Sequence, residues 1–320
     1  MIGGKAAMAD YDIIIIGAGV AGLTAAATAA RLGSHTLVID SMGVGGQVMT
    51  VDRISNFPGF PEPISGIELG PLLQEQAEAF GAEMRLASVI GIVGSEDGLT
   101  VSCDDGDVSC RAVIVAAGSS RRKSGLPGEE ALEGRGVSHC ASCDGPLLRD
   151  RAAVVVGGGD SAFDEAAVLS DYANTVILAY RSDAPRAQQR AVAEADARDN
   201  IVQRPNTTVE ALEGEGGLTA VRLCDTVSGE VETVAADGVF FYLGLDPNTD
   251  FLGGLLELDA DGRIRTDGDL QSSHPMVFAA GDIRAGAVSL LSAAAGEGAT
   301  AAISAHRAVT SAHTLEEVAA

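Results

Sequence analysis

A glycine-rich motif that follows a run of isoleucines places the strongest constraint on the fold of this chain. Residues 12–33 read DIIIIGAGVAGLTAAATAARLG, where four isoleucines predict a buried parallel strand and Gly17-x-Gly19-x-x-Gly22 leads into an alanine-rich helix. The next strand-like run, TLVID, ends in Asp40. The glycines let a pyrophosphate approach the helix N-terminus, and the acid can accept a hydrogen bond from a ribose. The segment therefore predicts a dinucleotide-binding fold.

The same pattern recurs in a second segment. Residues 151–181, RAAVVVGGGDSAFDEAAVLSDYANTVILAYR, predict a strand, a helix and a strand around Gly157-x-Gly159-x-x-Ala162. A GxGxxG motif alone is weak evidence, but each copy here has its strand and its helix in place. The chain therefore predicts two nucleotide-binding folds, and 320 residues suffice for two domains.

The two copies differ at the end of their second strand. Where the first copy has Asp40, 23 positions after the first glycine (40 − 17), the second copy has Tyr180 (157 + 23), followed by Arg181 and Arg186. An acid suits a free ribose 2′-hydroxyl, whereas arginine suits a 2′-phosphate. We therefore expect FAD in the first fold and NADPH in the second, with NADH possible. The alternative for the two arginines is a solvated loop.

Two further strand-like segments complete the first fold. RAVIVAAGS, at residues 111–119, contains Gly118 at its end. HPMVFAAGDIRAG, at residues 274–286, runs into Gly281 and Asp282, and an acid just beyond a strand can bind a sugar hydroxyl.

The order of these segments predicts a discontinuous first domain. We expect an α/β fold of two Rossmann-like three-layer nucleotide-binding domains. Residues 1–118 and 247–320 would form the FAD-binding domain, and residues 119–246, which carry the CxxC, the inserted NAD(P)H-binding domain. The junction sequences, SSRRKSG and GLDPNTD, are polar and carry glycine or proline, as crossing points between domains commonly do.

The charge of the chain excludes some partners. It carries 45 acidic and 21 basic residues, a formal net charge of −24, which repels nucleic acid and anionic membranes. No run of about 18 apolar residues predicts a membrane span, and the first residues lack the apolar stretch of a secretion signal. We therefore expect no nucleic-acid or membrane partner and a cytoplasmic location, where disulfides are transient.

Cys140 and Cys143 form the one cysteine motif, in the stretch HCASCDG at residues 139–145. A CxxC pair can close a disulfide, and its neighbours can lower the pKa of a thiol toward neutrality. Asp144 can carry a proton for the thiolate nucleophile. A zinc site would need four ligands, and no second CxxC or HxxxH is present. We interpret the pair as a redox disulfide rather than a metal site or two buried cysteines, and expect no metal.

The remaining cysteines and His139 are interpreted as structural. Cys103, Cys110 and Cys224 lie in or beside apolar runs, where free cysteines act as small buried hydrophobic residues. An imidazole at position 139 can favour a thiolate or move a proton, but a residue next to Cys140 in an extended segment points away from it. We therefore favour a surface position for His139.

Taken in order, the motifs resemble those of the low-molecular-weight thioredoxin reductase family over nearly the whole chain. The matching segments are GAGVAG, GVGGQ (43–47), SNFPGFPEPISG (55–66), AAG (116–118), CASCDG, GGGDSAFDEA (157–166) and FAAGD (278–282). In the related large disulfide reductases the redox pair lies on a helix of the flavin domain, near the position of GVGGQ. This chain has no cysteine there.

The resemblance implies roles for residues near the flavin. It implies that Gly46, Gln47 and Asn56 lie close to FAD and that Asp282 holds its ribityl chain.

The resemblance also implies roles at the redox pair. Cys143 would face the flavin, Cys140 would attack the substrate disulfide, and Asp144 would move protons. The family is a homodimer whose NADPH domain rotates between two poses, so a homodimer is expected here.

Three places depart from the family pattern. After Gly281-Asp282 the family has Tyr-Arg-Gln, which contacts the flavin, where this chain has Val288, Ser289 and Leu290. The family has two Phe after CDG that help to dock thioredoxin, where this chain has Pro146 and Leu147. The family has two adjacent arginines in the nucleotide domain, where this chain has Arg181 and Ser182. Aromatic anchors often dominate a docking surface. We therefore expect either a thioredoxin-like protein or a small disulfide as the substrate.

The leading interpretation is an NAD(P)H-dependent oxidoreductase of the thioredoxin-disulfide reductase type, which passes electrons through FAD and the Cys140–Cys143 disulfide. The first alternative is a dithiol oxidase that forms a disulfide in a small molecule with oxygen as acceptor. The second is a ferredoxin- or flavodoxin-coupled enzyme without a nicotinamide site, and the third is a non-catalytic redox sensor. An intact second nucleotide motif argues against the oxidase, and Arg181 and Arg186 argue against the ferredoxin-coupled form.

Overall fold

Two compact units make up the protein. The structure is a computed structural model, and it describes residues 9–51, 53–95 and 98–319. The N-terminal segment 1–8, in which the sequence predicts no secretion signal, lies outside the described residues. The first unit comprises Met1–Ser120 with Asp246–Ala320, and the second comprises Arg121–Leu245. The sequence places these crossings after residue 118 and after residue 246.

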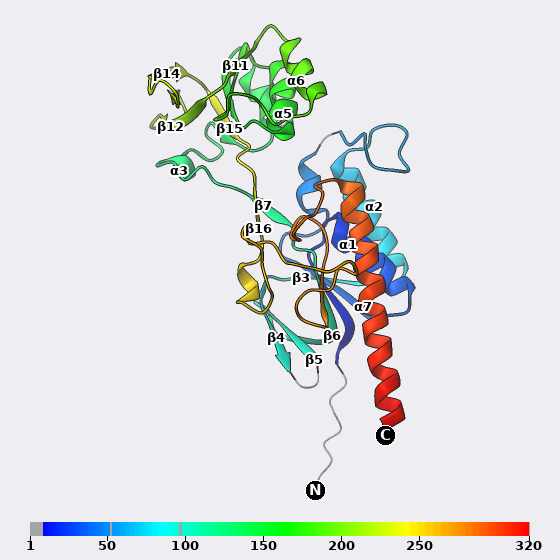
Figure 1. Ribbon diagram of the computed structural model, residues 1–320. Helices are drawn as coiled ribbons and strands as arrows, with labels where there is room; N and C mark the ends of the chain where they lie inside the picture. Colours follow the sequence, from blue (N-terminus) through cyan, green and yellow to red (C-terminus); the bar gives the residue numbers. More distant parts are fainter. Residues whose placement is uncertain (1–8, 52, 96–97, 320) are drawn as a thin grey trace. The chain divides into compact units, whose positions relative to one another are not determined.

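A seven-stranded sheet is the centre of the first unit (Figure 1). Its strands are β1 (Tyr11–Ile16), β2 (Thr36–Asp40), β3 (Glu83–Leu86), β4 (Val89–Ser95), β5 (Gly98–Cys103), β6 (Val108–Val115) and β17 (Val277–Ala279). The order is β3-β2-β1-β6-β5-β4, and β17 pairs with β6. The β1, β2, β3, β6 and β17 pairings are parallel, whereas β4 and β5 add an antiparallel hairpin. Ile13, Ile14 and Ile15 of β1 are fully buried because both faces of this strand are covered.

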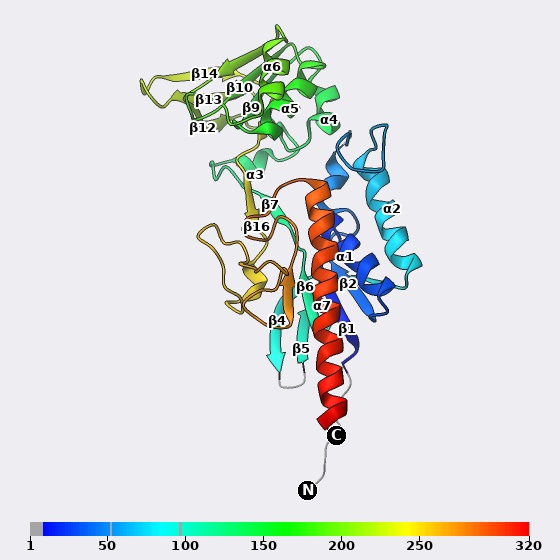
Figure 2. The same ribbon diagram turned by 45° about the vertical axis from the view of Figure 1, so that its right-hand side comes forward.

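The helices of the first unit pack closely because their contact residues are small. The helices are α1 (Val20–Arg31), η1 (Gly46–Thr50), α2 (Gly66–Ala79), η3 (Asp250–Leu252) and α7 (Leu291–Ala319). α7 runs alongside α1 in both views (Figures 1 and 2). A Cβ atom at Gly298 of α7 would lie 2.1 Å from the carbonyl oxygen of Ala21, so only glycine permits this approach. α2 begins with a capping box between Ser65 and Glu68.

The second unit is built on a smaller parallel sheet. Its strands are β8 (Val137–Ser138), β9 (Ala152–Val156), β10 (Thr175–Ala179), β11 (Ile201–Arg204) and β15 (Gly238–Phe241). They follow the order β11-β10-β9-β15-β8, with all pairs parallel. The helices are α3 (Glu129–Leu132), α4 (Ala141–Asp144), η2 (Gly145–Leu148), α5 (Asp160–Ser170) and α6 (Gln189–Asp196). A separate antiparallel sheet contains β12 (Thr207–Glu213), β13 (Ala220–Asp225) and β14 (Val231–Ala235).

The two segments that connect the units pair with each other as β-strands. β7 (Ser119–Arg121) and β16 (Leu245–Pro247) form a two-stranded sheet. The strand predicted at residues 111–119 is therefore two strands. β6 ends at Val115, because Gly118 adopts a φ of +61° and turns the chain before β7 begins.

The predicted fold class is confirmed: each unit contains a sheet built on parallel strands with helices around it, and a glycine-rich turn follows β1 in the first unit and β9 in the second. No described helix is long and apolar enough to cross a membrane. Cys103 and Cys110 are buried in the first unit as predicted, whereas Cys224 on β13 is only partly buried.

Candidate redox and nucleotide sites

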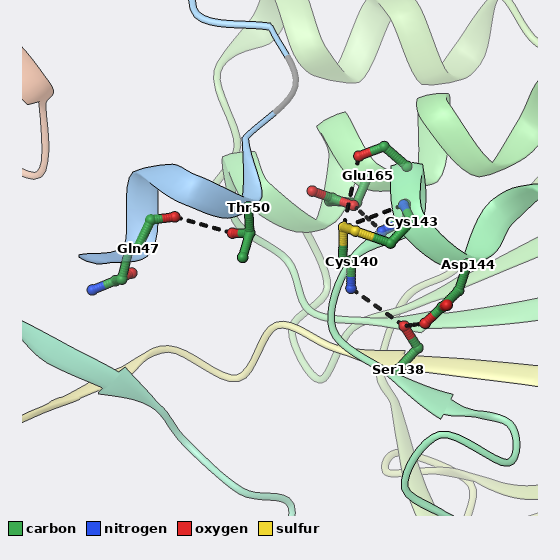
Figure 3. Close-up of a disulfide and its surroundings, with 9 residues drawn as sticks. Gln47, Thr50, Ser138, Cys140, Cys143, Asp144 and Glu165 are labelled. Atoms are coloured by element: carbon green, nitrogen blue, oxygen red, sulfur yellow. Dashed lines mark hydrogen bonds between the residues drawn. A yellow bond between two sulfur atoms is a disulfide. The ribbon is translucent and has the colours of Figure 1, made fainter. Parts of the chain in front are cut away.

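Cys140 and Cys143 form a disulfide at the start of α4 in the second unit (Figure 3). Cys140 is the N-cap residue of this short helix, and its Sγ accepts a hydrogen bond of 3.2 Å from the backbone N–H of Cys143. An N–H group aimed at sulfur stabilises a thiolate more than a thiol, because hydrogen bonds to charged acceptors are stronger. The geometry therefore favours Cys140 as the thiolate after reduction.

Ser138 links the peptide before the disulfide to the acid after it. Its hydroxyl donates to Oδ2 of Asp144 at 2.5 Å and accepts the N–H of Cys140 at 3.3 Å (Figure 3). Asp144 is thus held beside the pair by a residue of β8. A carboxylate in this position can exchange a proton with a nearby thiol.

Glu165 of α5 approaches the disulfide segment from the opposite side of α4. Its Oε2 accepts the N–H of Ala141, the residue that follows Cys140, at 2.8 Å (Figure 3). Burial raises the pKa of the Glu165 carboxyl group, against the lowering effects of the Ala141 N–H, Tyr242 and Arg121. Neither Glu165 nor Tyr242 is among the site residues predicted from the sequence. In the sequence, Glu165 is visible only as an acidic residue on the predicted helix of the second nucleotide-binding fold, which does not indicate its partner.

His139 does not extend freely into solvent. Its Nε2 lies 3.2 Å from Oε1 of Glu133, and its side chain is 31% exposed. The predicted surface position is therefore only partly correct, since the ring packs down against its carboxylate partner.

The first glycine turn leaves open space at one glycine and none at the other two. A Cβ atom at Gly17 would lie 2.4 Å from the oxygen of Ala116, and one at Gly22 would lie 1.8 Å from the oxygen of Gly17. A Cβ atom at Gly19, the N-cap residue of α1, would meet nothing within 4 Å. The helix N-terminus is thus accessible beside Gly19, which fits a bound pyrophosphate.

Asp40 binds the backbone around this turn. Oδ2 accepts the N–H of Ala18 at 2.8 Å, and Oδ1 accepts the N–H groups of Met42 and Gly43 at 2.8 and 2.9 Å. The sequence predicts Asp40 as a ribose ligand. The structure adds that the same carboxylate holds two glycine-rich loops together, since Gly45 also donates to the oxygen of Ala18.

The other residues predicted near the flavin all belong to the first unit. Gly46 lies against the Cα atom of Gly19, and the Gln47 side chain donates to the oxygen of Ser119 at 2.8 Å. The hydroxyl of Thr50 donates to the Gln47 carbonyl at 3.0 Å (Figure 3). Asn56 is exposed.

The strand end at Gly281 and Asp282 has a partner that sequence reasoning missed. Glu297 of α7 accepts the Gly281 N–H at 2.8 Å and pairs with Arg284. Burial raises the pKa of Asp282, while Arg263 and Ser289 act to lower it. Ser289, one of the departures from the family pattern, therefore stabilises the charged form of the predicted flavin ligand.

The second glycine turn has the same open position as the first, at Gly159, but its other glycines pack against tyrosine residues. A Cβ atom at Gly157 would lie 2.5 Å from the oxygen of Tyr242, while one at Gly159 would meet nothing within 4 Å. Gly158 packs against the ring of Tyr180. Ala162 is fully buried in the first turn of α5.

The arginines predicted at the second turn lie on one loop. The Gly158 oxygen accepts the N–H of Arg186 at 2.7 Å, so this loop folds back onto the turn. Arg181 and Arg186 are both exposed. Among the residues that the structure describes, neither guanidinium forms an ion pair, which leaves both available for a phosphate.

The remaining departures from the family pattern lie on the surface. Leu147, directly after the CxxC segment, is 71% exposed, and Pro146 beside it is exposed as well. Val288 and Leu290 of the first unit are 58% and 47% exposed.

Known proteins with this sequence pattern match over both units. A sequence model of the pyridine nucleotide-disulphide oxidoreductase family matches residues 11–298. The thioredoxin reductases of Treponema pallidum and Mycolicibacterium smegmatis are each 42% identical, covering 92% and 93% of this chain and 95% and 96% of their own lengths. The crystal structure of Lactococcus lactis thioredoxin reductase (FR conformation) matches with a TM-score of 0.90 and 36% identity, over 94% of this chain and 100% of that one.

Proposed function

The chain belongs to the low-molecular-weight thioredoxin reductase family and is a flavoprotein disulfide reductase, and from this premise we propose that NADPH, FAD and the Cys140–Cys143 disulfide carry its electrons. The acceptor is a thioredoxin-like protein or another disulfide. The observation that carries the proposal is the disulfide itself, which lies in the same compact unit as the second glycine turn.

FAD fits the first unit better than a nicotinamide nucleotide does. Space is open beside Gly19 at the N-terminus of α1, and the acid after the second strand, Asp40, suits an unphosphorylated ribose. Gly281 and Asp282 follow β17, at the carboxyl end of a strand of the same sheet, where Asp282 can accept a hydrogen bond from a ribityl hydroxyl. Bound FAD would supply the electron pair that opens the disulfide.

NADPH fits the second unit because of its arginines. Open space beside Gly159 and the 11-residue helix α5 provide for the pyrophosphate. Arg181 and Arg186 follow the second strand, where they can bind a 2′-phosphate through charge-assisted hydrogen bonds. Ser182 supplies no charge, so the preference for NADPH over NADH rests on these two residues.

The two cysteines have different tasks in this proposal. After reduction, the Cys140 thiolate attacks one sulfur of the substrate disulfide, forming a mixed disulfide and releasing the other substrate sulfur as a thiolate. The Cys143 thiolate then attacks Cys140 Sγ, which restores the Cys140–Cys143 disulfide and releases the second substrate thiolate. Asp144 carries protons between the cysteines and the released thiolates.

The substrate and the assembly follow from the same premise. The homologous enzymes are named for thioredoxin. Pro146 and Leu147 offer an apolar but non-aromatic surface beside the redox pair, so a small disulfide is the other candidate. The protein is a cytoplasmic homodimer in this proposal.

The proposal is tested by steady-state turnover with a thioredoxin disulfide and with a small aromatic disulfide. Cys140→Ser should lose NADPH-dependent reduction of both substrates while it keeps its flavin absorbance. If Cys140→Ser turns over every disulfide substrate as fast as the unmodified enzyme, the proposed route is wrong. Peroxide formation from a dithiol, without flavin reduction by NADPH, would instead identify a dithiol oxidase.

A further inference from the structure

The helix that carries the redox disulfide is too short to hold its own shape. α4 contains four residues, Ala141–Asp144, and a single helical turn is unfavourable in isolation because it fixes several dihedral angles for one hydrogen bond. Its geometry must therefore come from contacts to other elements. At its C-terminal end, the Ser138 hydroxyl donates a hydrogen bond to Asp144. Gly145 packs on the ring of Tyr172 so closely that a Cβ atom at Gly145 would lie 2.7 Å from the Cδ2 atom of that ring.

At its N-terminal end, the anchor is Glu165. The carboxylate accepts the Ala141 N–H at 2.8 Å, and Ala141 is fully buried. This N–H belongs to the first turn of α4, where it has no partner within the helix. The same turn directs the Cys143 N–H to Cys140 Sγ at 3.2 Å. A fixed Ala141 peptide thus fixes the donor that the Cys140 thiolate needs.

Tyr242, which follows β15 beside the second glycine turn, interacts electrostatically with Glu165. The backbone N–H of Tyr242 donates to the Val156 carbonyl oxygen at 2.7 Å, and the Tyr242 carbonyl oxygen lies close to Gly157. Among the described residues, the buried Tyr242 hydroxyl has no hydrogen-bond partner. Burial and, after it, the Glu165 carboxyl group raise the pKa of the Tyr242 phenol, so the two side chains interact electrostatically.

Other charged groups also face Glu165. Arg121, at the end of β7, favours the charged carboxylate, and Asp164, its neighbour on α5, disfavours it. Glu165 is therefore a partly buried acid with one peptide donor, one phenol and one arginine around it, and the peptide donor belongs to the disulfide segment.

We propose that Glu165 is a positioning residue of the redox disulfide: its carboxyl group holds the Ala141 N–H, so that the Cys143 N–H stabilises the Cys140 thiolate. This inference rests on the proposed function, in which Cys140 is the attacking thiolate. Opening the disulfide takes up two electrons and one proton, leaving Cys140 as the thiolate and Cys143 as the thiol.

The test is the pH profile of Cys140 alkylation in the flavin-loaded enzyme reduced with dithiothreitol, with the labelled site identified by mass spectrometry. Glu165→Ala removes the acceptor and should raise the apparent pKa of the Cys140 thiol by about one unit, which slows alkylation about tenfold below that pKa. Glu165→Gln keeps an oxygen acceptor for the Ala141 N–H, so the pKa should not rise.

Asp164→Asn is the matched control, because this carboxyl group is adjacent on α5 but, among the described residues, makes no hydrogen bond or ion pair with α4, and it should leave the profile unchanged. An unchanged profile in Glu165→Ala, or an equal upward shift in Glu165→Gln, overturns the proposal. If Glu165→Ala fails to retain flavin, Glu165→Asp decides, because its shorter side chain withdraws the acceptor from the Ala141 N–H, and an unchanged profile there overturns the proposal.

This experiment separates the two proposals. Dithiothreitol reduces the disulfide without nucleotide, so the Cys140 profile can be measured even if electrons from NADPH take another route. Retained turnover in Cys140→Ser overturns the function and leaves the alkylation result standing. A pH profile of Cys140 alkylation that is unchanged in Glu165→Ala overturns the positioning role and leaves the proposed function intact.

Discussion

The two glycine turns share their spacing but differ in how closely the helix approaches the strand. In the first turn, a Cβ atom at Gly22 would lie 1.8 Å from the Gly17 oxygen, so helix and turn pack backbone against backbone. In the second, the corresponding residue is Ala162, which is fully buried and has room for its methyl group. The third position of the motif therefore tolerates a side chain only where the helix lies further from the turn.

The turns differ again at the end of the following strand. Asp40 accepts three backbone N–H groups and binds two loops together, whereas Tyr180 packs its ring on Gly158 and donates its hydroxyl to Gln203 at 3.1 Å. The first turn is organised around a carboxylate and the second around an aromatic ring. In the proposed function, the charges that select the nucleotide come from the strand end itself in one unit and from the next loop in the other.

Exchanging the third residue of each motif should have the largest effect. Gly22→Ala places a methyl group on the Gly17 oxygen, and overpacking of this kind costs about 3 kcal/mol. We expect purified Gly22→Ala to lose flavin and unfold at a lower temperature, measured by flavin fluorescence and calorimetry. Ala162→Gly, the reverse change in the second unit, should cost only about 1 kcal/mol. Equal losses for the two variants would contradict the difference in packing.

Removing the strand-end residue should have the next largest effect. Asp40→Ala leaves three N–H groups without their acceptor and should lower the free energy of unfolding by about 2 kcal/mol in a urea titration. Tyr180→Phe loses one hydrogen bond and should cost about 1 kcal/mol. A larger loss for Tyr180→Phe than for Asp40→Ala would show that the carboxylate does not organise the first turn.

Only part of this arrangement is readable from the sequence. Gly17, Gly22 and Asp40 act within one βαβ unit, so their spacing alone predicts where they meet. Glu165 and Ala141 are 24 positions apart, and Glu297 reaches Gly281 across 16 positions from a separate helix. Such contacts depend on how helices pack onto sheets. Nothing in the periodicity of either helix marks its acidic residue as a ligand of a distant peptide.

The arginines of the second unit should affect one nucleotide only. Arg181→Gln or Arg186→Gln removes a charge-assisted bond to a 2′-phosphate, so we expect KM for NADPH to rise about tenfold and KM for NADH to stay unchanged. Arg149→Gln, an exposed arginine of the same unit, is the control. Equal increases in KM for both nucleotides would mean that the arginines do not distinguish the two nucleotides.

Replacing Cys110, a buried thiol of the first unit, should give the smallest effect. Burial raises the pKa of Cys110 from 9.0 to about 12. The unfolded chain therefore loses this proton above about pH 9 while the folded protein keeps it, so stability falls as pH rises through this range. The loss should be about 1 kcal/mol at pH 10. Cys110→Ala should flatten the fall in unfolding free energy between pH 9 and 10, and an unchanged slope would contradict this assignment.

The most direct test of the account is an anaerobic titration of the flavin-loaded enzyme with NADPH. If the flavin and the Cys140–Cys143 disulfide both accept an electron pair, the enzyme should consume about two equivalents per subunit, and added thioredoxin disulfide should reoxidise it. The double variant Cys140→Ser/Cys143→Ser should consume about one equivalent and pass nothing to thioredoxin. Equal uptake by both proteins would contradict the account, because the disulfide would then lie outside the electron path.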